Sequence, residues 1–283
     1  MNCPCERDAT RGHDGGPCKS GWIRTHVPSY PDSEVSCLLV EQGLRPVLLH
    51  PLSRLLARLR DDGISRSLQW LWYHLRWRMR ERMLGVDTGE QAFGVVVDDD
   101  GENHCYEAID TRCFELILDS LSIDAGRDVF LDLGCGKGRA LVLAASLPFK
   151  RVYGLELSAP LSAIATRNVH AAQKRLACQD VRVIQGSAAS TPLPDDVTVL
   201  FMFNPFSGSI LEQAMEQVHE SLKRQPRKLR VVYVLPVDAV NHLDTLDWLA
   251  RKSRIEPGYL EVDECLVYET CGTPAGDQTV AAT

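Results

Sequence analysis

The residues best suited to chemistry lie in one short stretch, Asp132-Leu-Gly-Cys-Gly-Lys-Gly138. Glycine occupies every second position at its end, so the backbone can turn sharply there and a ligand can approach it closely. The stretch follows an apolar run from Val129 that is typical of a buried strand. It precedes an apolar helical segment over residues 140–147, whose first amides are free to bind a ligand. This pattern predicts a nucleotide-like cofactor site at the carboxyl edge of a parallel sheet.

The spacing of the glycines excludes two other nucleotide-binding motifs. A dinucleotide fingerprint G-x-G-x-x-G that starts at Gly134 would place its third glycine where Arg139 stands. A P-loop has serine or threonine directly after its lysine, whereas Lys137 is followed by Gly138. Cys135 lies inside the turn, where a small side chain is required, and we expect it to pack rather than to act as a nucleophile.

Strands and helices alternate along the chain around this turn. Strands are expected over residues 129–133, 151–156, 181–185, 197–203, 228–235, about 255–259 and 265–269, and further helices over residues 106–121, 158–176, 209–222 and 240–251. Such alternation predicts βαβ units and a mainly parallel sheet with helices on both faces. The final strand pair has no helix between its members, which suits an antiparallel edge.

Polar residues stand where the second and third strands end, at the edge where a parallel sheet binds its ligand. Glu156 ends the second strand, and its carboxylate can accept hydrogen bonds from both hydroxyls of a ribose. Its plain structural interpretation is a solvated strand end beside the next helix N-terminus. The third strand ends in Gly186-Ser187-Ala188. We expect the ribose interpretation, because a glycine turn precedes Glu156.

The fourth strand ends in Asn204-Pro205-Phe206. An asparagine oxygen and a nearby backbone carbonyl can hold an amino group by its hydrogens and aim its lone pair at a reacting carbon. Pro205 fixes the loop and Phe206 supplies a flat apolar wall, although Asn-Pro is also an ordinary turn. We favour the catalytic interpretation because the tripeptide follows a strand of the predicted ligand edge. Tyr106 is either a lining residue of the same site or a plain surface or core aromatic.

The composition of the 283-residue chain, with 45% hydrophobic and 24% charged residues, is that of an ordinary globular protein. The net charge of −7 gives no general attraction to nucleic acid or an anionic membrane, so any such contact must be local. Neither a secretory signal nor an apolar run of the about 18 residues needed to cross a bilayer is found. We therefore expect a cytoplasmic protein with no integral membrane span, with reduced cysteines and, in the absence of a metal-ligand or hydrolase motif, no metal.

The chain divides into four parts. Residues 1–45 are rich in Gly, Pro, Ser and Asp and are expected to be disordered. Residues 46–104 form a basic helical extension and a turn, residues 105–271 the cofactor-binding domain, and residues 272–283 a disordered tail. The basic segment 51–83 is expected to dock on the domain by its aromatic face, with its arginines in solvent. The alternative is an acidic partner or an anionic membrane surface.

The pattern Asp132-x-Gly134-x-Gly136-x-Gly138 resembles motif I of the class I S-adenosylmethionine-dependent methyltransferases. The resemblance covers about residues 105–270 and includes Glu156. The Asn204-Pro205-Phe206 tripeptide is similar to the N-P-P-[YF] loop of amino-methylating enzymes, with one proline fewer. The turn Gly85-Val-Asp-Thr-Gly89 resembles that of a group of bacterial methyltransferases, and Gly154-Leu-Glu156 is similar to a segment of the non-SET lysine methyltransferases.

The resemblance implies an α/β, Rossmann-like fold: a seven-stranded, mostly parallel sheet with an antiparallel last strand and helices on both faces, here preceded by a helical N-terminal extension. It implies S-adenosyl-L-methionine as the cofactor and Asn204, Pro205 and Phe206 as the catalytic site. The implied cofactor-binding residues are Asp132, Gly134, Cys135, Gly136, Gly138, Glu156, Leu157, Ser187, Ala188 and Asn204.

The resemblance also bears on substrates. Methyltransferases commonly have an aspartate where Ser187 stands, accepting from the adenine amino group, so here a hydroxyl or a backbone group must do so. The implied methyl acceptor is a nucleophilic group, first a protein lysine and then a small molecule or a nucleic-acid base. A non-catalytic module that binds the cofactor, a membrane or a partner is the alternative from another class.

Overall fold

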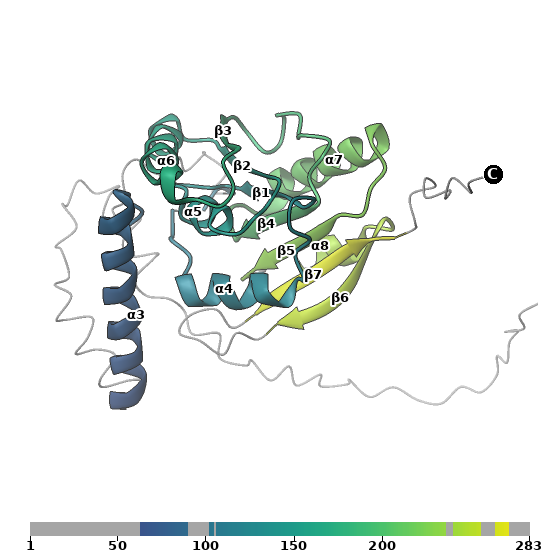
Figure 1. Ribbon diagram of the computed structural model, residues 1–283. Coiled ribbons are helices and arrows are strands. Elements are labelled where there is room, and N and C mark those ends of the chain that lie inside the picture. Colours follow the sequence, from purple (N-terminus) through teal and green to yellow (C-terminus); the bar gives the residue numbers. More distant parts are fainter. Residues whose placement is uncertain (1–62, 90–101, 105, 236–239, 256–263, 272–283) are drawn as a thin grey trace, which may run out of the picture.

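The structure is a computed structural model that describes residues 63–89, 102–104, 106–235, 240–255 and 264–271. A sheet of seven strands has the order β3-β2-β1-β4-β5-β7-β6 (Figure 1). The strands are β1 (Val129–Leu133), β2 (Arg151–Glu156), β3 (Val181–Gln185), β4 (Val199–Phe203), β5 (Arg230–Val234), β6 (Leu249–Ile255) and β7 (Cys265–Thr270). Neighbouring strands are parallel except at β7, which is antiparallel to both β5 and β6. The predicted mostly parallel sheet with an antiparallel last strand is confirmed.

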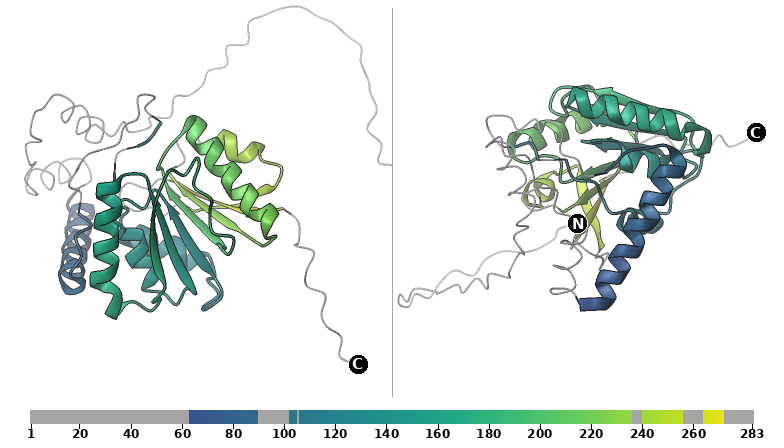
Figure 2. Two further views of the ribbon diagram at one scale, coloured as in Figure 1. Left: turned by 90° about the horizontal axis from the view of Figure 1, so that it is seen from above. Right: turned by 90° about the vertical axis from the view of Figure 1, so that its left-hand side faces the viewer.

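Helices cover both faces of this sheet. The helices α4 (Thr111–Ser120), α5 (Arg139–Ala145) and α6 (Ala159–Ala172) pack on one face, and α7 (Gly208–Arg224) and α8 (Val240–Thr245) pack on the other (Figure 2). A 3₁₀ turn over Gln173–Arg175 follows α6. The sheet has a hydrophobic core on each face. Successive side chains of a strand point to opposite faces, so they belong to different cores. Phe130 packs with the α4–α5 side and Leu131 with the α7 side, so β1 is buried on both faces.

Strand order places a ligand crevice beside β1. The chain leaves β1 in one direction to form β2 and β3, then returns to the other side of β1 to form β4 and β5. At such a switch point the helices that follow the two halves lie on opposite faces, so the carboxyl ends of the strands border an open crevice.

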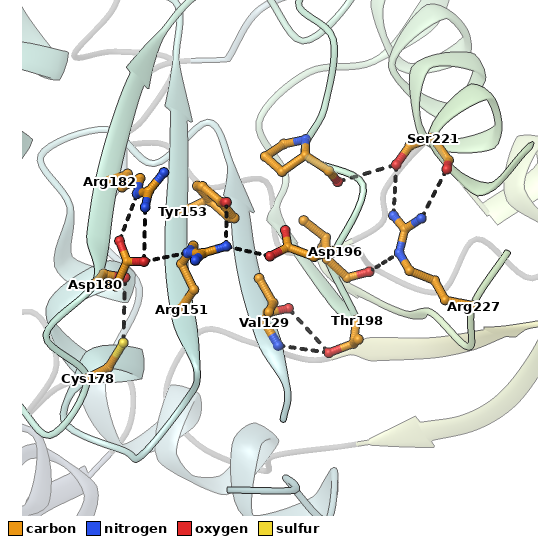
Figure 3. Close-up of polar contacts among 12 residues, drawn as sticks. Val129, Arg151, Tyr153, Cys178, Asp180, Arg182, Asp196, Thr198, Ser221 and Arg227 are labelled. Carbon is orange, nitrogen blue, oxygen red and sulfur yellow. Dashed lines mark hydrogen bonds and ion pairs between the residues drawn. The ribbon is translucent and has the colours of Figure 1, made fainter. Parts of the chain in front are cut away.

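The amino ends of the strands carry paired charges (Figure 3). The Arg151 guanidinium donates to Asp180 at 2.5 Å and to Asp196 at 2.6 Å. At the start of the neighbouring strands, Arg230 donates to Asp128 at 2.6 Å. These contacts tie the beginnings of five strands together.

The helix α3 (Gly63–Leu84) precedes the domain and confirms the predicted helical extension. Its Trp77 and Leu84 are buried in the core on the α4–α5 side. The guanidinium of Arg80 lies 5.9 Å from the Trp77 ring centroid, and that of Arg139 lies 5.1 Å from it. None of the helices in the described ranges combines the length and apolar character that a membrane crossing needs.

Two predicted element boundaries near the end of the domain are wrong. The helix expected over residues 240–251 ends at Thr245, and residues 249–255 form β6, which pairs with β7. The charged residues from Arg251 to Arg254 are exposed, as is usual on an edge strand, and their helix-like composition hides the strand. The predicted strand over residues 255–259 therefore starts too late, and its residues 256–259 lie outside the described ranges.

The helix expected over residues 106–121 begins at Thr111 instead. The Asp110 carboxylate accepts hydrogen bonds from the amides of Arg112 and Cys113, at 2.8 and 3.0 Å, and so caps the helix there. Residues 106–110 form no regular secondary structure, and residues 106–109 line the cavity described below. The segments predicted to be disordered, 1–45 and 272–283, lie outside the described residues, as does the part of the basic segment before Gly63.

Candidate active site

The glycine turn after β1 is held against β2. The amides of Gly134 and Cys135 both donate to the Leu155 carbonyl, at 2.9 and 3.0 Å. Gly134 and Gly136 have φ values of 85° and 53°, which side chains disfavour. A Cβ at Gly134 would lie 2.6 Å from Cβ of Pro205, and one at Gly136 would lie 2.2 Å from the ring of Tyr106. Both glycines are therefore required by backbone conformation and by close neighbours.

The carboxylate of Glu156 is fixed by backbone amides at the end of β2. One of its oxygens accepts from the Gly136 amide at 2.8 Å, and the other accepts from the Ser158 amide at 2.8 Å. Burial raises the pKa of Glu156, and these hydrogen bonds counteract part of that rise. The bonds orient the carboxylate and join the glycine turn to the start of α6.

Asp132 is a second buried acid beside this turn. Burial, and after it the negative charge of Glu156, raises the pKa of Asp132 to about 8. Neither acid forms an ion pair with any residue of the described ranges. Two close carboxyl groups in a poorly solvated place hold a proton at neutral pH, and a cationic ligand would release it.

The loop after β4 is held by a segment about a hundred residues earlier in the chain. Asn103 forms an antiparallel bridge with Phe206, and the His104 amide donates to the Pro205 carbonyl at 3.1 Å. Asn204 has a φ of 39°, and its amide donates to the Val234 carbonyl at 3.1 Å. The loop conformation is therefore set by β5 on one side and by residues 103–104 on the other.

The ring of His104 forms a hydrogen bond with the loop after β4. Its Nδ1 lies 2.8 Å from the Asn204 carbonyl oxygen. A carbonyl can only accept, so Nδ1 carries the hydrogen and Nε2 of the neutral ring is left as an acceptor. His104 lines the same cavity as Asn204. The sequence analysis did not identify it, because only the tertiary pairing with the 204–206 loop brings it to the site.

A single cavity at the carboxyl edge brings nearly all the predicted site residues together. Gly138 is the exception: it begins α5 and does not line the cavity. The predicted residues that line it are Asp132, Gly134, Cys135, Gly136, Glu156, Leu157, Ser187, Ala188, Asn204, Pro205 and Phe206. Tyr106 also lines it, which supports the lining interpretation of that residue. The Cys135 thiol is buried, which raises its pKa, so it is unsuited to act as a nucleophile.

A turn that follows α3 is bound to the back of the glycine motif. Its Thr88 carbonyl accepts from the Tyr106 hydroxyl at 3.0 Å and from the Arg139 guanidinium at 2.9 Å. The Lys137 ammonium donates to the Gly89 carbonyl at 2.6 Å. The basic residues of the motif thus hold the protein's own backbone.

Comparison with known proteins identifies this region. Residues 130–225 match the family model described as a methyltransferase domain. The matched segment covers about a third of the chain, from β1 to the end of α7, and it includes the glycine turn, Glu156 and the loop after β4. The cofactor that the sequence predicts for such a domain is S-adenosyl-L-methionine. A search of curated proteins finds no match.

Solved structures with a similar arrangement include other methyltransferases. A SAM-dependent methyltransferase from Aquifex aeolicus is 17% identical, with a TM-score of 0.45 over 56% of this chain and 89% of that one. An RNA methyltransferase from Salinibacter ruber, in complex with S-adenosyl-L-homocysteine, is 20% identical, with a TM-score of 0.43 over 60% of this chain and 98% of that one. A ribosomal protein L11 methylase from Lactobacillus delbrueckii subsp. bulgaricus is 14% identical, with a TM-score of 0.42 over 56% of this chain and 77% of that one.

The residues at the cavity fit this cofactor. S-adenosylmethionine carries cationic sulfonium and ammonium groups and a ribose with two hydroxyls. The buried acids Asp132 and Glu156 have no cationic partner among the described residues, and together they offer the acceptors and negative charge that such a ligand needs. The space that a side chain at Gly134 or Gly136 would need is filled by Pro205 and Tyr106, which both line the cavity.

Proposed function

We propose that the methyltransferase domain transfers a methyl group to an amino nitrogen, with the side-chain amine of a protein lysine as the first acceptor class. The observation that supports this is the contact between the Asn204-Pro205-Phe206 loop and the glycine turn. Pro205 packs so closely on Gly134 that no Cβ would fit between them. The loop that resembles the amine-binding loop of amino-methylating enzymes therefore lies directly against the turn of motif I.

The proposal gives each side of the cavity a role in holding the cofactor. Glu156 is the proposed acceptor for the ribose hydroxyls, and the Ser187-Ala188 segment, with Leu157 nearby, is the proposed contact for the adenine. Asp132 and the turn from Gly134 to Gly136 are the proposed contacts for the rest of the cofactor. When bound, S-adenosylmethionine supplies a methyl group already activated by its sulfonium.

The residues of the chain then need to orient the acceptor and accept its proton. The carbonyls of Asn204 and Pro205 already accept from His104. The side-chain amide of Asn204, for which no partner is recorded within the described ranges, is the proposed acceptor for an amine N–H. Nε2 of His104 is the proposed acceptor for the proton that a lysine ammonium must lose before it can act as a nucleophile. Phe206 is buried and lines the cavity, and it is the proposed apolar wall beside the acceptor.

The acceptor class can be tested with labelled cofactor. Full-length protein and methyl-labelled S-adenosylmethionine are incubated with a cell extract, which is then divided into protein, RNA and small-molecule fractions. We expect label in protein, recovered as methyl-lysine after acid hydrolysis. Asn204→Gly should lose this label while still binding the cofactor, because glycine accepts the φ of 39° at this position.

The other outcomes distinguish the alternatives. Label confined to the RNA or small-molecule fraction would rule out the lysine proposal and retain the methyltransferase. A protein that binds S-adenosylmethionine but labels no fraction would favour the non-catalytic module instead.

A further inference from the structure

The helix α3 has apolar residues on two opposite sides. One side, with Trp77 and Leu84, is buried against the domain. The other side exposes large apolar side chains, from 51% for Leu75 to 70% for Ile64. We call this second side the α3 outer stripe; its members are Ile64, Leu68, Trp72, Leu75, Met79 and Met83.

The α3 outer stripe is continuous along the helix. Its members are separated by four, four, three, four and four positions, which keeps them on one side of an α-helix. Over this length the helix rises about 28 Å, at about 1.5 Å per residue. Among the described residues, Figure 1 shows the sheet and the other helices all to one side of α3. A surface of this size and character marks an interaction site.

Cations border the stripe. Arg76, Arg78 and Arg82 are exposed, and on a helical projection they fall beside or within it. Glu81 is the acidic residue of α3, and its carboxylate is already bound by the amide and hydroxyl of Thr88, at 2.8 and 2.6 Å. The outer side of α3 is therefore both apolar and cationic, in a chain whose net charge is −7.

We infer that the α3 outer stripe lies on an anionic lipid surface. Apolar side chains, a tryptophan and flanking arginines on one side of a helix that does not cross the bilayer are the features of a helix lying in the membrane interface. The arginines would reach the lipid phosphates while the apolar residues enter the acyl boundary. A second copy of the chain is a poorer occupant, because pairing two such stripes would bring their arginines together without an acid to face them.

Binding of α3 to the membrane would fix the position and orientation of the cavity relative to the lipid surface. The end of α3 is joined to the active site through Glu81 and Thr88, and Thr88 accepts from the Tyr106 hydroxyl at the cavity. The inference does not depend on which acceptor is methylated.

Vesicle sedimentation of the full-length protein tests the inference. Vesicles of phosphatidylcholine with phosphatidylglycerol are compared with vesicles of phosphatidylcholine alone, at about 0.1 M salt. We expect binding to the anionic vesicles to be at least about tenfold tighter and to weaken as salt is raised. Arg76→Glu combined with Arg82→Glu should weaken it at least about tenfold, since each surface arginine contributes about fivefold.

Two further variants make the test specific. Leu68→Gln combined with Met79→Gln should also weaken binding about tenfold or more, because it removes apolar area without changing charge. The matched charge control is Arg167→Glu combined with Arg175→Glu, on the exposed side of α6 and the following turn, which should bind as the wild type does. Unchanged binding of S-adenosylmethionine verifies that each variant is folded.

Three results would overturn the inference. The first is an equal loss of vesicle binding in the α3 and control charge variants, which would indicate general electrostatics. The second is unchanged vesicle binding after Leu68→Gln with Met79→Gln. The third is absence of vesicle binding together with self-association, or capture of an acidic peptide, that depends on the α3 outer stripe.

Discussion

The two edges of the sheet differ in whether their acidic side chains are paired with basic ones. At the amino edge, acids and bases are paired, as Arg151 is with Asp180 and Asp196 (Figure 3). At the carboxyl edge, Asp132 and Glu156 are buried with no ion pair to a described residue. Burying an unpaired acid costs free energy, so the difference indicates that the amino edge stabilises the fold while the carboxyl edge is kept ready for a ligand.

The largest expected difference between the edges is in the pH dependence of stability. With its pKa at about 8, Asp132 keeps in the folded chain a proton that the unfolded chain releases. Its contribution to the free energy of unfolding is therefore highest below about pH 4 and falls by several kcal/mol as pH rises to about 8. Asp132→Asn should remove this fall and make the protein more stable than wild type at about pH 8.

The matched acid at the amino edge should behave in the opposite way. Burial alone would raise the pKa of Asp128, but hydrogen bonds from the Asp124 amide, Arg230 and Thr198 outweigh it and lower the pKa. Its stabilising contribution is present at neutral pH and is lost as pH falls through the folded pKa. Asp128→Asn should therefore destabilise the protein at neutral pH. Urea unfolding at about pH 5 and about pH 8 compares the variants, and responses of the same sign would refute the contrast.

Substitution of Gly136 tests whether this glycine is required for cofactor binding or only for the backbone conformation. Gly136→Ala should weaken S-adenosylmethionine binding more than about a hundredfold, or about 3 kcal/mol, because its Cβ would lie 2.2 Å from the Tyr106 ring at the cavity. Gly126→Ala is the control, since Gly126 also has a positive φ, of 75°, but no atom lies within 4 Å of its Cβ position. It should lose about 1–2 kcal/mol of stability and keep its affinity. Wild-type affinity in Gly136→Ala would show that the turn does not border the cofactor.

Substitution of His104 tests the proposed methyl-acceptor side of the cavity. His104→Asn keeps a side-chain donor near the Asn204 carbonyl but removes the proton acceptor Nε2. We expect kcat to fall about a hundredfold while the affinity for S-adenosylmethionine stays the same. Steady-state kinetics with the identified acceptor, together with calorimetry of cofactor binding, separate the two effects. An unchanged kcat would assign His104 only the role of holding the loop.

The cofactor side of the site could be predicted from the sequence, and the acceptor side only in part. The glycine turn and Glu156 stand directly at strand ends, so a local pattern marks their place, and the structure brings both to the same cavity. Asn204 was found by the same logic. His104 was missed because its place depends on a bridge between Asn103 and Phe206, and pairing at that separation leaves no local signal.

The remaining differences between the sequence predictions and the structure have similar causes. The first residues of β6 fall within the helix predicted over residues 240–251, because the charged residues of this strand show no apolar alternation, and only pairing with β7 makes them a strand. The periodicity of α3 predicted a helix but could not say which of its two apolar sides would meet the domain. That choice depends on Trp77, which tertiary packing places against Arg139.

Calorimetric titration of S-adenosylmethionine into Glu156→Gln and Arg151→Met most directly tests the contrast between the edges. The first variant should lose about 10- to 100-fold in affinity with little loss of stability, because it removes a charged acceptor at the ligand edge. The second should lose about 1 kcal/mol of stability and keep wild-type affinity, because it breaks only partly exposed ion pairs at the amino edge. Equal affinities in the wild type and Glu156→Gln, or an affinity loss confined to Arg151→Met, would contradict the account.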